Sequence, residues 1–206
     1  MDVNVTPARR TQADRTAATR EALITAARTL FADHGYAQIG TERVAQAAGV
    51  TRGALYHQFS DKAELFAAVL EAVEVDLTTH LIDVVSGVAS DDPLAALVAG
   101  VDAWLDASTR PEVRQIVLLD GPAVLGWERW RAVGERYGLG LVTGLLSELM
   151  EAEAIPRQPV EALAHVLIGA LDEAVLFIAL AADPVRARAD VATVLHRLVI
   201  AVTTQT

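Results

Sequence analysis

The chain has 206 residues, of which 52% are hydrophobic and 21% charged, so it can bury a sizeable core. It contains no cysteine, which excludes disulfides, thiolate metal sites and a cysteine nucleophile. The net charge of −10 argues against a nucleic-acid partner, but the charge is unevenly spread. Residues 1–60 carry seven arginines against five acidic residues, a net charge of +2, whereas residues 61–206 carry ten basic against 22 acidic residues, a net charge of −12. This asymmetry predicts two modules with different partners.

Helical periodicity throughout the chain predicts an all-α fold of about nine helices. Alternating β-branched runs are missing, and the seven prolines divide the chain into pieces of helical length. Besides two short helices between 40 and 59, we expect helices over about 16–34, from about 61, from 93, after Pro111, after Pro122, over about 159–182 and from Pro184 to about 203. No secretion signal or membrane span is expected, since acidic residues interrupt the most apolar stretch, and a cytoplasmic protein is predicted.

Residues 1–18 are predicted to form a flexible basic arm. The arm contains Arg9, Arg10 and Arg15, and arms of this kind can enter the minor groove of DNA beside a major-groove site. A solvated tail without a partner is the simpler alternative.

The segment from Gly40 to Phe59 predicts two short helices joined by a tight turn. Gly49 supplies the left-handed residue that ends the first helix, and Thr51 is a good N-cap for the second. Small Ala45 allows the helices to cross closely. This arrangement is that of a helix-turn-helix, whose second helix lies in the major groove, although an ordinary helical corner has similar features.

The outward residues of the second short helix suit contacts with duplex DNA. Arg52 can form two hydrogen bonds with a guanine edge, while Gly53 and Ala54 allow the backbone to approach the bases. Tyr56, His57 and Lys62 can donate to phosphates, which position the protein without specifying sequence. The complete set of predicted DNA-binding residues is Thr41, Arg43, Thr51, Arg52, Gly53, Ala54, Tyr56, His57 and Lys62.

These residues resemble the TetR family of bacterial transcriptional regulators over roughly 19–66. The resemblance is carried by Phe31, Gly35-Tyr36, Val44-Ala45, Ala48-Gly49-Val50-Thr51, Gly53-Ala54-Leu55-Tyr56-His57-Gln58-Phe59 and Lys62-x-x-Leu65. It implies a DNA-binding domain over 19–66, and a helical domain over 67–206 that dimerises and binds a small effector. This chain has Ile39-Gly40 where members often have Thr followed by Ser or Thr, so Thr41 would have to replace the usual capping hydroxyl.

The helical body offers a candidate effector pocket. Aromatic residues gather there, and two adjacent carboxylates interrupt an apolar helix, where unpaired charges would be costly. The predicted pocket residues are Trp104, Trp127, Tyr137, Asp172, Glu173 and Phe177. They suit a largely apolar ligand of drug-like size, with Asp172 or Glu173 holding a cationic or polar group. Packing of the aromatic residues in the core and structural pairing of the carboxylates are the alternatives.

Nothing in the pattern predicts catalysis, a cofactor or a metal site. The five histidines are scattered, and Gly138-Leu-Gly140-Leu-Val-Thr-Gly144 has the wrong spacing and no preceding strand for a dinucleotide loop. We expect a homodimer with Leu167, Leu171, Leu195 and Leu198 in its interface, because the last two helices have long apolar surfaces. The favoured function is a repressor that a small molecule releases from a palindromic operator. The alternatives are a body that answers to a protein partner or to no ligand, and an all-α enzyme.

Overall fold

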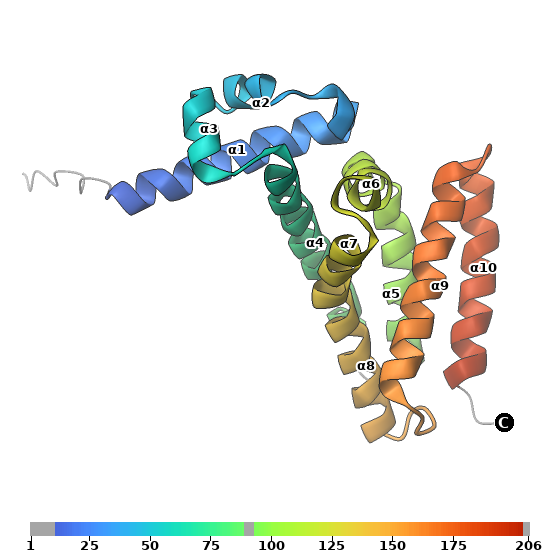
Figure 1. Ribbon diagram of the computed structural model, residues 1–206. Helices are drawn as coiled ribbons and strands as arrows, with labels where there is room; N and C mark the ends of the chain where they lie inside the picture. The colour runs from blue at the N-terminus through green and yellow to red at the C-terminus, as the bar shows by residue number, and fades with distance from the viewer. Residues whose placement is uncertain (1–10, 89–92, 204–206) are drawn as a thin grey trace, which may run out of the picture. The chain divides into compact units, whose positions relative to one another are not determined.

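The computed structural model describes residues 11–88 and 93–203, and these residues form helices and connecting turns without any strand (Figure 1). The predicted all-α fold is thereby confirmed. The helices are α1 (Gln12–His34), η1 (Tyr36–Gln38), α2 (Thr41–Ala47), α3 (Arg52–Gln58), α4 (Lys62–Ser86), α5 (Pro93–Ser108), η2 (Val113–Asp120), α6 (Gly121–Leu125), α7 (Trp127–Gly134), η3 (Glu135–Leu139), α8 (Gly140–Glu151), α9 (Val160–Leu180) and α10 (Pro184–Thr203). The chain forms two compact units that divide after Val69, within the continuous helix α4.

The first unit begins with helix α1, which starts earlier than the sequence suggests. Thr11 and Asp14 form a capping box: the Thr11 amide donates to Asp14 Oδ2 at 2.9 Å, and the Asp14 amide donates to Thr11 Oγ1 at 3.2 Å. Hydrogen bonding of the Asp14 carboxyl with the Thr11 side chain and with the Thr11 amide lowers the pKa of that carboxyl. Residues 12–18, predicted as part of a flexible arm, are therefore helical, and Arg15 is exposed on α1. Arg9 and Arg10 lie outside the described residues.

A shared apolar core holds α1 to α3 and the start of α4 together. The largest fully buried side chains in this unit are Leu23, Phe31, Ile39, Val44, Leu55, Leu65, Phe66 and Val69. Rings from three elements pack around the centre: the Phe31 and Phe66 ring centroids are 5.7 Å apart, and Tyr36 meets Phe66 edge-on at 5.2 Å. This core fixes the positions of the two short helices α2 and α3.

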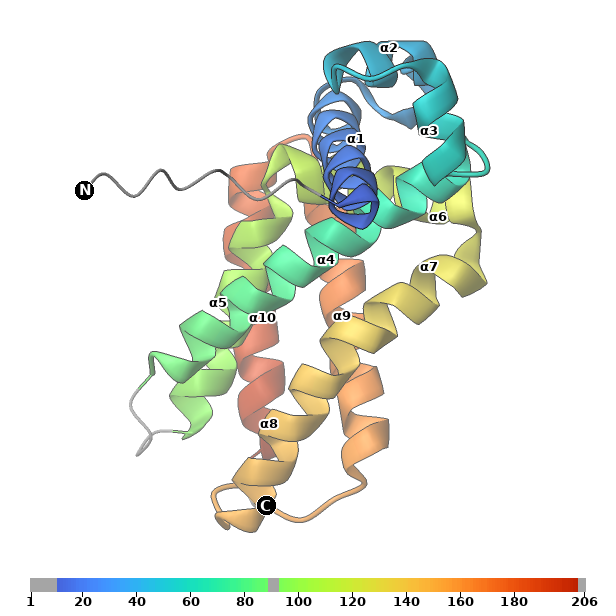
Figure 2. The same ribbon diagram turned by 90° about the vertical axis from the view of Figure 1, so that its left-hand side faces the viewer.

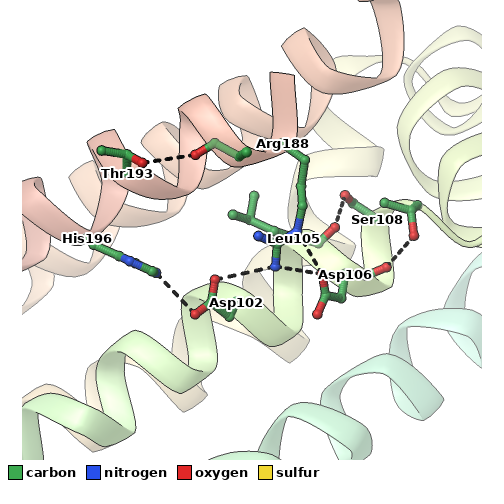
Figure 3. Close-up of polar contacts among 9 residues, drawn as sticks. Asp102, Leu105, Asp106, Ser108, Arg188, Thr193 and His196 are labelled. Carbon is green, nitrogen blue, oxygen red and sulfur yellow. Dashed lines mark hydrogen bonds and ion pairs between the residues drawn. The ribbon is translucent and has the colours of Figure 1, made fainter. Parts of the chain in front are cut away.

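In the second unit, α5, α9 and α10 pack side by side (Figures 1 and 2). A polar cluster joins α5 to α10 (Figure 3): Arg188 Nε donates to Asp106 Oδ1 at 2.8 Å, and its Nη2 reaches Asp102 Oδ1 at 3.4 Å. His196 Nε2 lies 3.2 Å from the other oxygen of Asp102, without hydrogen-bond alignment. Because the cluster is partly exposed, we expect it to add little stability and to serve mainly to fix the register of α5 against α10.

The helix expected after Pro122 begins instead at Trp127. Pro122 lies at the start of the short helix α6, and Gly126 then adopts φ 77°, which ends α6 and starts α7. From Trp127, the segments α7, η3 and α8 run as one rod with a π-helical turn in its middle (Figure 2). With η2 and α6 also continuous, the described residues form nine continuous helices apart from η1.

Alanine substitutions at two glycines of the second unit should have opposite effects on the free energy of unfolding. A Cβ at Gly121 would lie 2.6 Å from Trp130 Cδ1, whereas one at Gly134 would meet no atom within 4 Å. We expect Gly121→Ala to lower the free energy of unfolding by about 1–3 kcal/mol, because the indole must move. The matched control, Gly134→Ala, should raise it by up to about 1 kcal/mol through helix propensity. Urea unfolding of both variants checks this, and equal stabilities would contradict the packing at Gly121.

Candidate nucleic-acid interface and effector cavity

The turn between α2 and α3 has the backbone that the sequence predicts for a helix-turn-helix. Gly49 has φ 68°, and the Val50 amide donates to the Ala45 carbonyl at 3.0 Å, which closes the end of α2. Thr51 then caps α3, since its Oγ1 accepts from the Ala54 amide at 3.1 Å. Leu55 is buried on the inner side of α3, so the opposite side faces outward.

The outer side of α3 presents most of the predicted DNA-binding residues. Arg52, Gly53, Tyr56 and His57 are exposed, and Ala54 is partly exposed. Thr51 is also exposed, with its hydroxyl engaged in the cap. On α2, Arg43 is exposed, and its Nη2 lies 3.1 Å from His34 Nε2. The surface thus combines one guanidinium near the start of α3 with small residues that allow close approach of a base pair.

Arg52 has a partner that sequence reasoning missed. Its Nη1 lies 2.6 Å from Glu42 Oε1, and its guanidinium carbon lies 5.4 Å from the centre of the Tyr56 ring. Glu42 is ten residues away on α2, so no local spacing indicated the pair. Both side chains are largely exposed, so the ion pair is weak and Arg52 can exchange it for a base edge.

Thr41 and Lys62 are engaged with other residues of the first unit, and neither is fully exposed. Thr41 is only 6% exposed and is the first residue of α2, so it does not replace the missing cap: the N-cap is Gly40, which has no side chain. The Thr41 hydroxyl lies 3.1 Å from the Tyr56 hydroxyl, and this bond lowers the pKa of Tyr56, with Arg52 adding to the effect. The Lys62 ammonium donates to the Tyr36 carbonyl at 2.6 Å and lies 3.7 Å from the Tyr36 ring centre.

The second unit contains a cavity of about 150 Å³ between its helices. Residues from α4, α5, η2, α7, η3, α8, α9 and α10 line it, and its walls are predominantly apolar. The cavity is smaller than the drug-sized pocket that the sequence suggested, which would need about 300 Å³ or more. An aliphatic cavity of about 150 Å³ accommodates benzene.

Three carboxyl groups belong to this lining, and the two with shifted pKa values are Glu74 on α4 and Asp172 on α9, while the third is Glu135 on η3. Glu74 is 7% exposed, and burial raises the pKa of its carboxyl to about 7, with the nearby charge of Asp172 adding to the shift. Burial also raises the pKa of Asp172 to about 6, and the positive charge of Arg131 opposes that shift. Glu74 is thus the more strongly perturbed group, and sequence reasoning missed it. Its signal was an acidic residue next to the apolar stripe of α4.

The cavity includes only part of the pocket predicted from sequence. Trp104 and Asp172 line it, whereas Tyr137 does not. Trp127, Glu173 and Phe177 are exposed, Trp127 by 61% and Phe177 by 56%. Glu173 and Phe177 are exposed because they share one face of α9, whereas the neighbouring Asp172 points toward another face. The indole nitrogen of Trp104 is buried without a hydrogen-bond partner among the described residues.

The leucines predicted for a dimer interface face inward for the most part. Leu167, Leu171 and Leu195 line the cavity, and Leu198 is partly exposed. Because α9 is apolar nearly all round, periodicity could not distinguish its inner face from its outer one. The large exposed apolar side chains of α9 are Val166, Phe177 and Leu180.

Comparisons with known proteins agree with the organisation of the chain into two units. Residues 23–69 match a family model described as bacterial regulatory proteins, tetR family, and residues 94–202 match one described as tetracyclin repressor-like, C-terminal domain. A TetR-family transcriptional regulator from Pectobacterium atrosepticum is similar in structure, with a TM-score of 0.83 and 29% identity over 95% of this chain and 99% of that one.

Two further proteins are similar over different extents. The transcriptional repressor AcnR of Corynebacterium glutamicum is 34% identical over 83 residues, which cover 38% of this chain and 44% of that protein. The structure of RolR in complex with resorcinol has a TM-score of 0.72 and 21% identity, over 91% of this chain and 90% of that one.

Fold and surface together define a helix-turn-helix DNA-binding regulator with a second, helical unit. The chain belongs to the TetR family of bacterial transcriptional regulators.

Proposed function

We propose that this DNA-binding regulator is a repressor that leaves a palindromic operator when a small molecule occupies the cavity of the second unit. The observation that carries the proposal is the apolar cavity with a buried carboxyl group, in a chain that also has a complete helix-turn-helix. AcnR is named as a repressor and RolR was solved with a small phenol, and both facts support the proposal.

The DNA-binding part of the proposal rests on α3 entering the major groove. Arg52 would read one base per half-site, while Arg43, Tyr56 and His57 would contact phosphates. A palindromic operator needs two such helices related by two-fold symmetry, so the regulator would act as a homodimer.

Helix α4 is the covalent link between the two functions. Its first residues belong to the core of the DNA-binding unit, and Glu74, Leu77 and Leu81 line the cavity further along the same helix. A ligand that binds better to one orientation of α4 than to another would shift the population of operator-binding dimers by that difference in affinity.

Fluorescence anisotropy on DNA from upstream of the protein's own gene tests this function. We expect specific binding that a cavity ligand reverses. DNA binding that no compound reverses would favour a body that answers to a protein partner or to no ligand. Absence of any specific DNA binding would favour the enzyme alternative.

We further propose that the exposed apolar face of α9 forms the dimer interface. Val166, Gly169, Glu173, Phe177 and Leu180 recur at helical spacing along this face, and all five are exposed. By length and composition alone α9 could also cross a membrane, with a mean hydropathy of 2.0 and a third of its most apolar window buried. Its packing against α5, α8 and α10, and the charged Asp172 within it, favour a protein interface.

Phe177→Glu should therefore weaken the dimer. A two-fold interface receives the charge twice, so we expect the dissociation constant of the dimer to rise at least about 100-fold. Light scattering at micromolar concentration should show a monomer mass for this variant and a dimer mass for Ile82→Glu, whose site on α4 is also exposed. A dimer mass for Phe177→Glu would place the interface elsewhere.

A further inference from the structure

Glu74 is more than nine-tenths buried, and the influences on the pKa of its carboxyl group are burial and the like charge of Asp172, with no compensating positive charge. Its neighbours on α4 that line the cavity, Leu77, Thr78 and Leu81, supply no charge to compensate it. A buried carboxylate that no positive charge compensates is strongly destabilising if it stays ionised. In the free protein, burial accordingly raises the pKa of Glu74 to about 7.

The other charged groups around the cavity leave an excess of negative charge. Arg131 of α7 forms an ion pair with Glu135 of η3, at 3.1 Å between Nε and Oε1. Asp172 and His165 line the cavity from α9. Arg131 is shared between Glu135 and Asp172, so the described lining of the cavity leaves no arginine or lysine to compensate Glu74.

We propose that the cavity binds a compact primary amine with a single aromatic ring, whose ammonium group pairs with Glu74 and Asp172. The ring suits the volume, since about 150 Å³ accommodates benzene, and the walls that receive it are apolar. Trp104 and Trp130 in the same lining offer aromatic faces, which attract cations. The ligand class follows from the cavity's size and charge, while its regulatory consequence rests on the proposed function.

A cationic ligand predicts a characteristic pH dependence. The ammonium group favours the ionised carboxylates, so binding should release protons and strengthen as the pH rises through the pKa of about 6 for Asp172 and about 7 for Glu74. A variant that lacks only the Glu74 charge separates the two contributions.

Calorimetry on the full chain with benzylamine, benzyl alcohol and benzoate, near pH 6 and pH 8, tests the ligand class. At pH 8 we expect benzylamine to bind at least about tenfold more tightly than benzyl alcohol, and benzoate to bind least, because hydrogen bonds between charged groups exceed neutral ones. The affinity for benzylamine should fall about tenfold near pH 6 as the carboxyl groups protonate. Glu74→Gln should remove most of this advantage. Asp83→Asn is the matched control on an exposed part of α4, and it should retain the advantage.

Several results would overturn the inference. Equal or tighter binding of the alcohol or of benzoate would do so, as would undiminished benzylamine binding by Glu74→Gln or no binding of benzylamine to the wild-type chain. Measuring the release of operator DNA by each compound distinguishes failure of this inference from failure of the proposed function. If the alcohol or the acid releases the operator and the amine does not, ligand control is supported and the amine is rejected as the ligand class. Amine binding without release would keep the site and reject ligand control.

Discussion

Arg52→Ala should weaken operator binding by about 1–3 kcal/mol and relax the choice of one base in each half-site. Arg52 is the exposed guanidinium near the start of α3, and the weak ion pair with Glu42 leaves it free to exchange partners. Fluorescence anisotropy with the operator and with variants of each base pair measures both effects.

The control for this substitution is Arg110→Ala, which removes one exposed positive charge from the second unit. It should leave the sequence preference unchanged. If Arg52→Ala kept both the affinity and the preference of the wild-type protein, α3 would not be the recognition helix.

The stability of the second unit should fall as the pH rises through the range in which Glu74 titrates. The folded state raises the pKa of Glu74 to about 7 from its ordinary value near 4.5, so the folded chain holds this proton more tightly than the unfolded chain. The contribution is fully present below about pH 4.5 and is lost as the pH passes about 7. A shift of this size corresponds to roughly 3 kcal/mol.

Urea unfolding between pH 5 and pH 8, monitored by tryptophan fluorescence, checks this effect. Glu74→Gln should flatten the pH dependence and exceed the wild-type chain in stability at pH 8, since the neutral amide carries no buried charge. The residual slope should have the same sign, because burial also raises the pKa of Asp172. An unchanged slope in Glu74→Gln would show that Glu74 does not titrate in this range.

The helix-turn-helix was predictable because its signals are local. Gly49, Thr51 and the buried Leu55 act within one or two turns of their own position, and the structure gives them the predicted roles. Thr41 and Lys62 were harder to place, since their partners Tyr56 and Tyr36 lie 15 and 26 residues away in the chain. Periodicity indicates which residues are outside a core, but not which polar groups meet there.

The cavity was only partly predictable for a related reason. The adjacent carboxylates of α9 indicated a polar site, but the rotation of the helix decided that Asp172 and not Glu173 lines it. Its counterpart Glu74 comes from a helix about 100 residues earlier, and only tertiary packing brings the two together. The inward orientation of Leu167 and Leu171 was hard to predict for the same reason, because both faces of α9 are apolar.

Helix α4 carries Phe66 in the core of the first unit and Glu74 in the wall of the cavity, eight residues later. Eight residues of α-helix span about 12 Å, and this length cannot change without breaking backbone hydrogen bonds. Under the proposed function, a bound molecule would therefore act on the first unit through the direction of α4 and not through its length. A sideways displacement of about 1 Å over this length is a tilt of about 5°, so under the proposed function a ligand longer by one methylene would be sensed as a small change in the direction of α4.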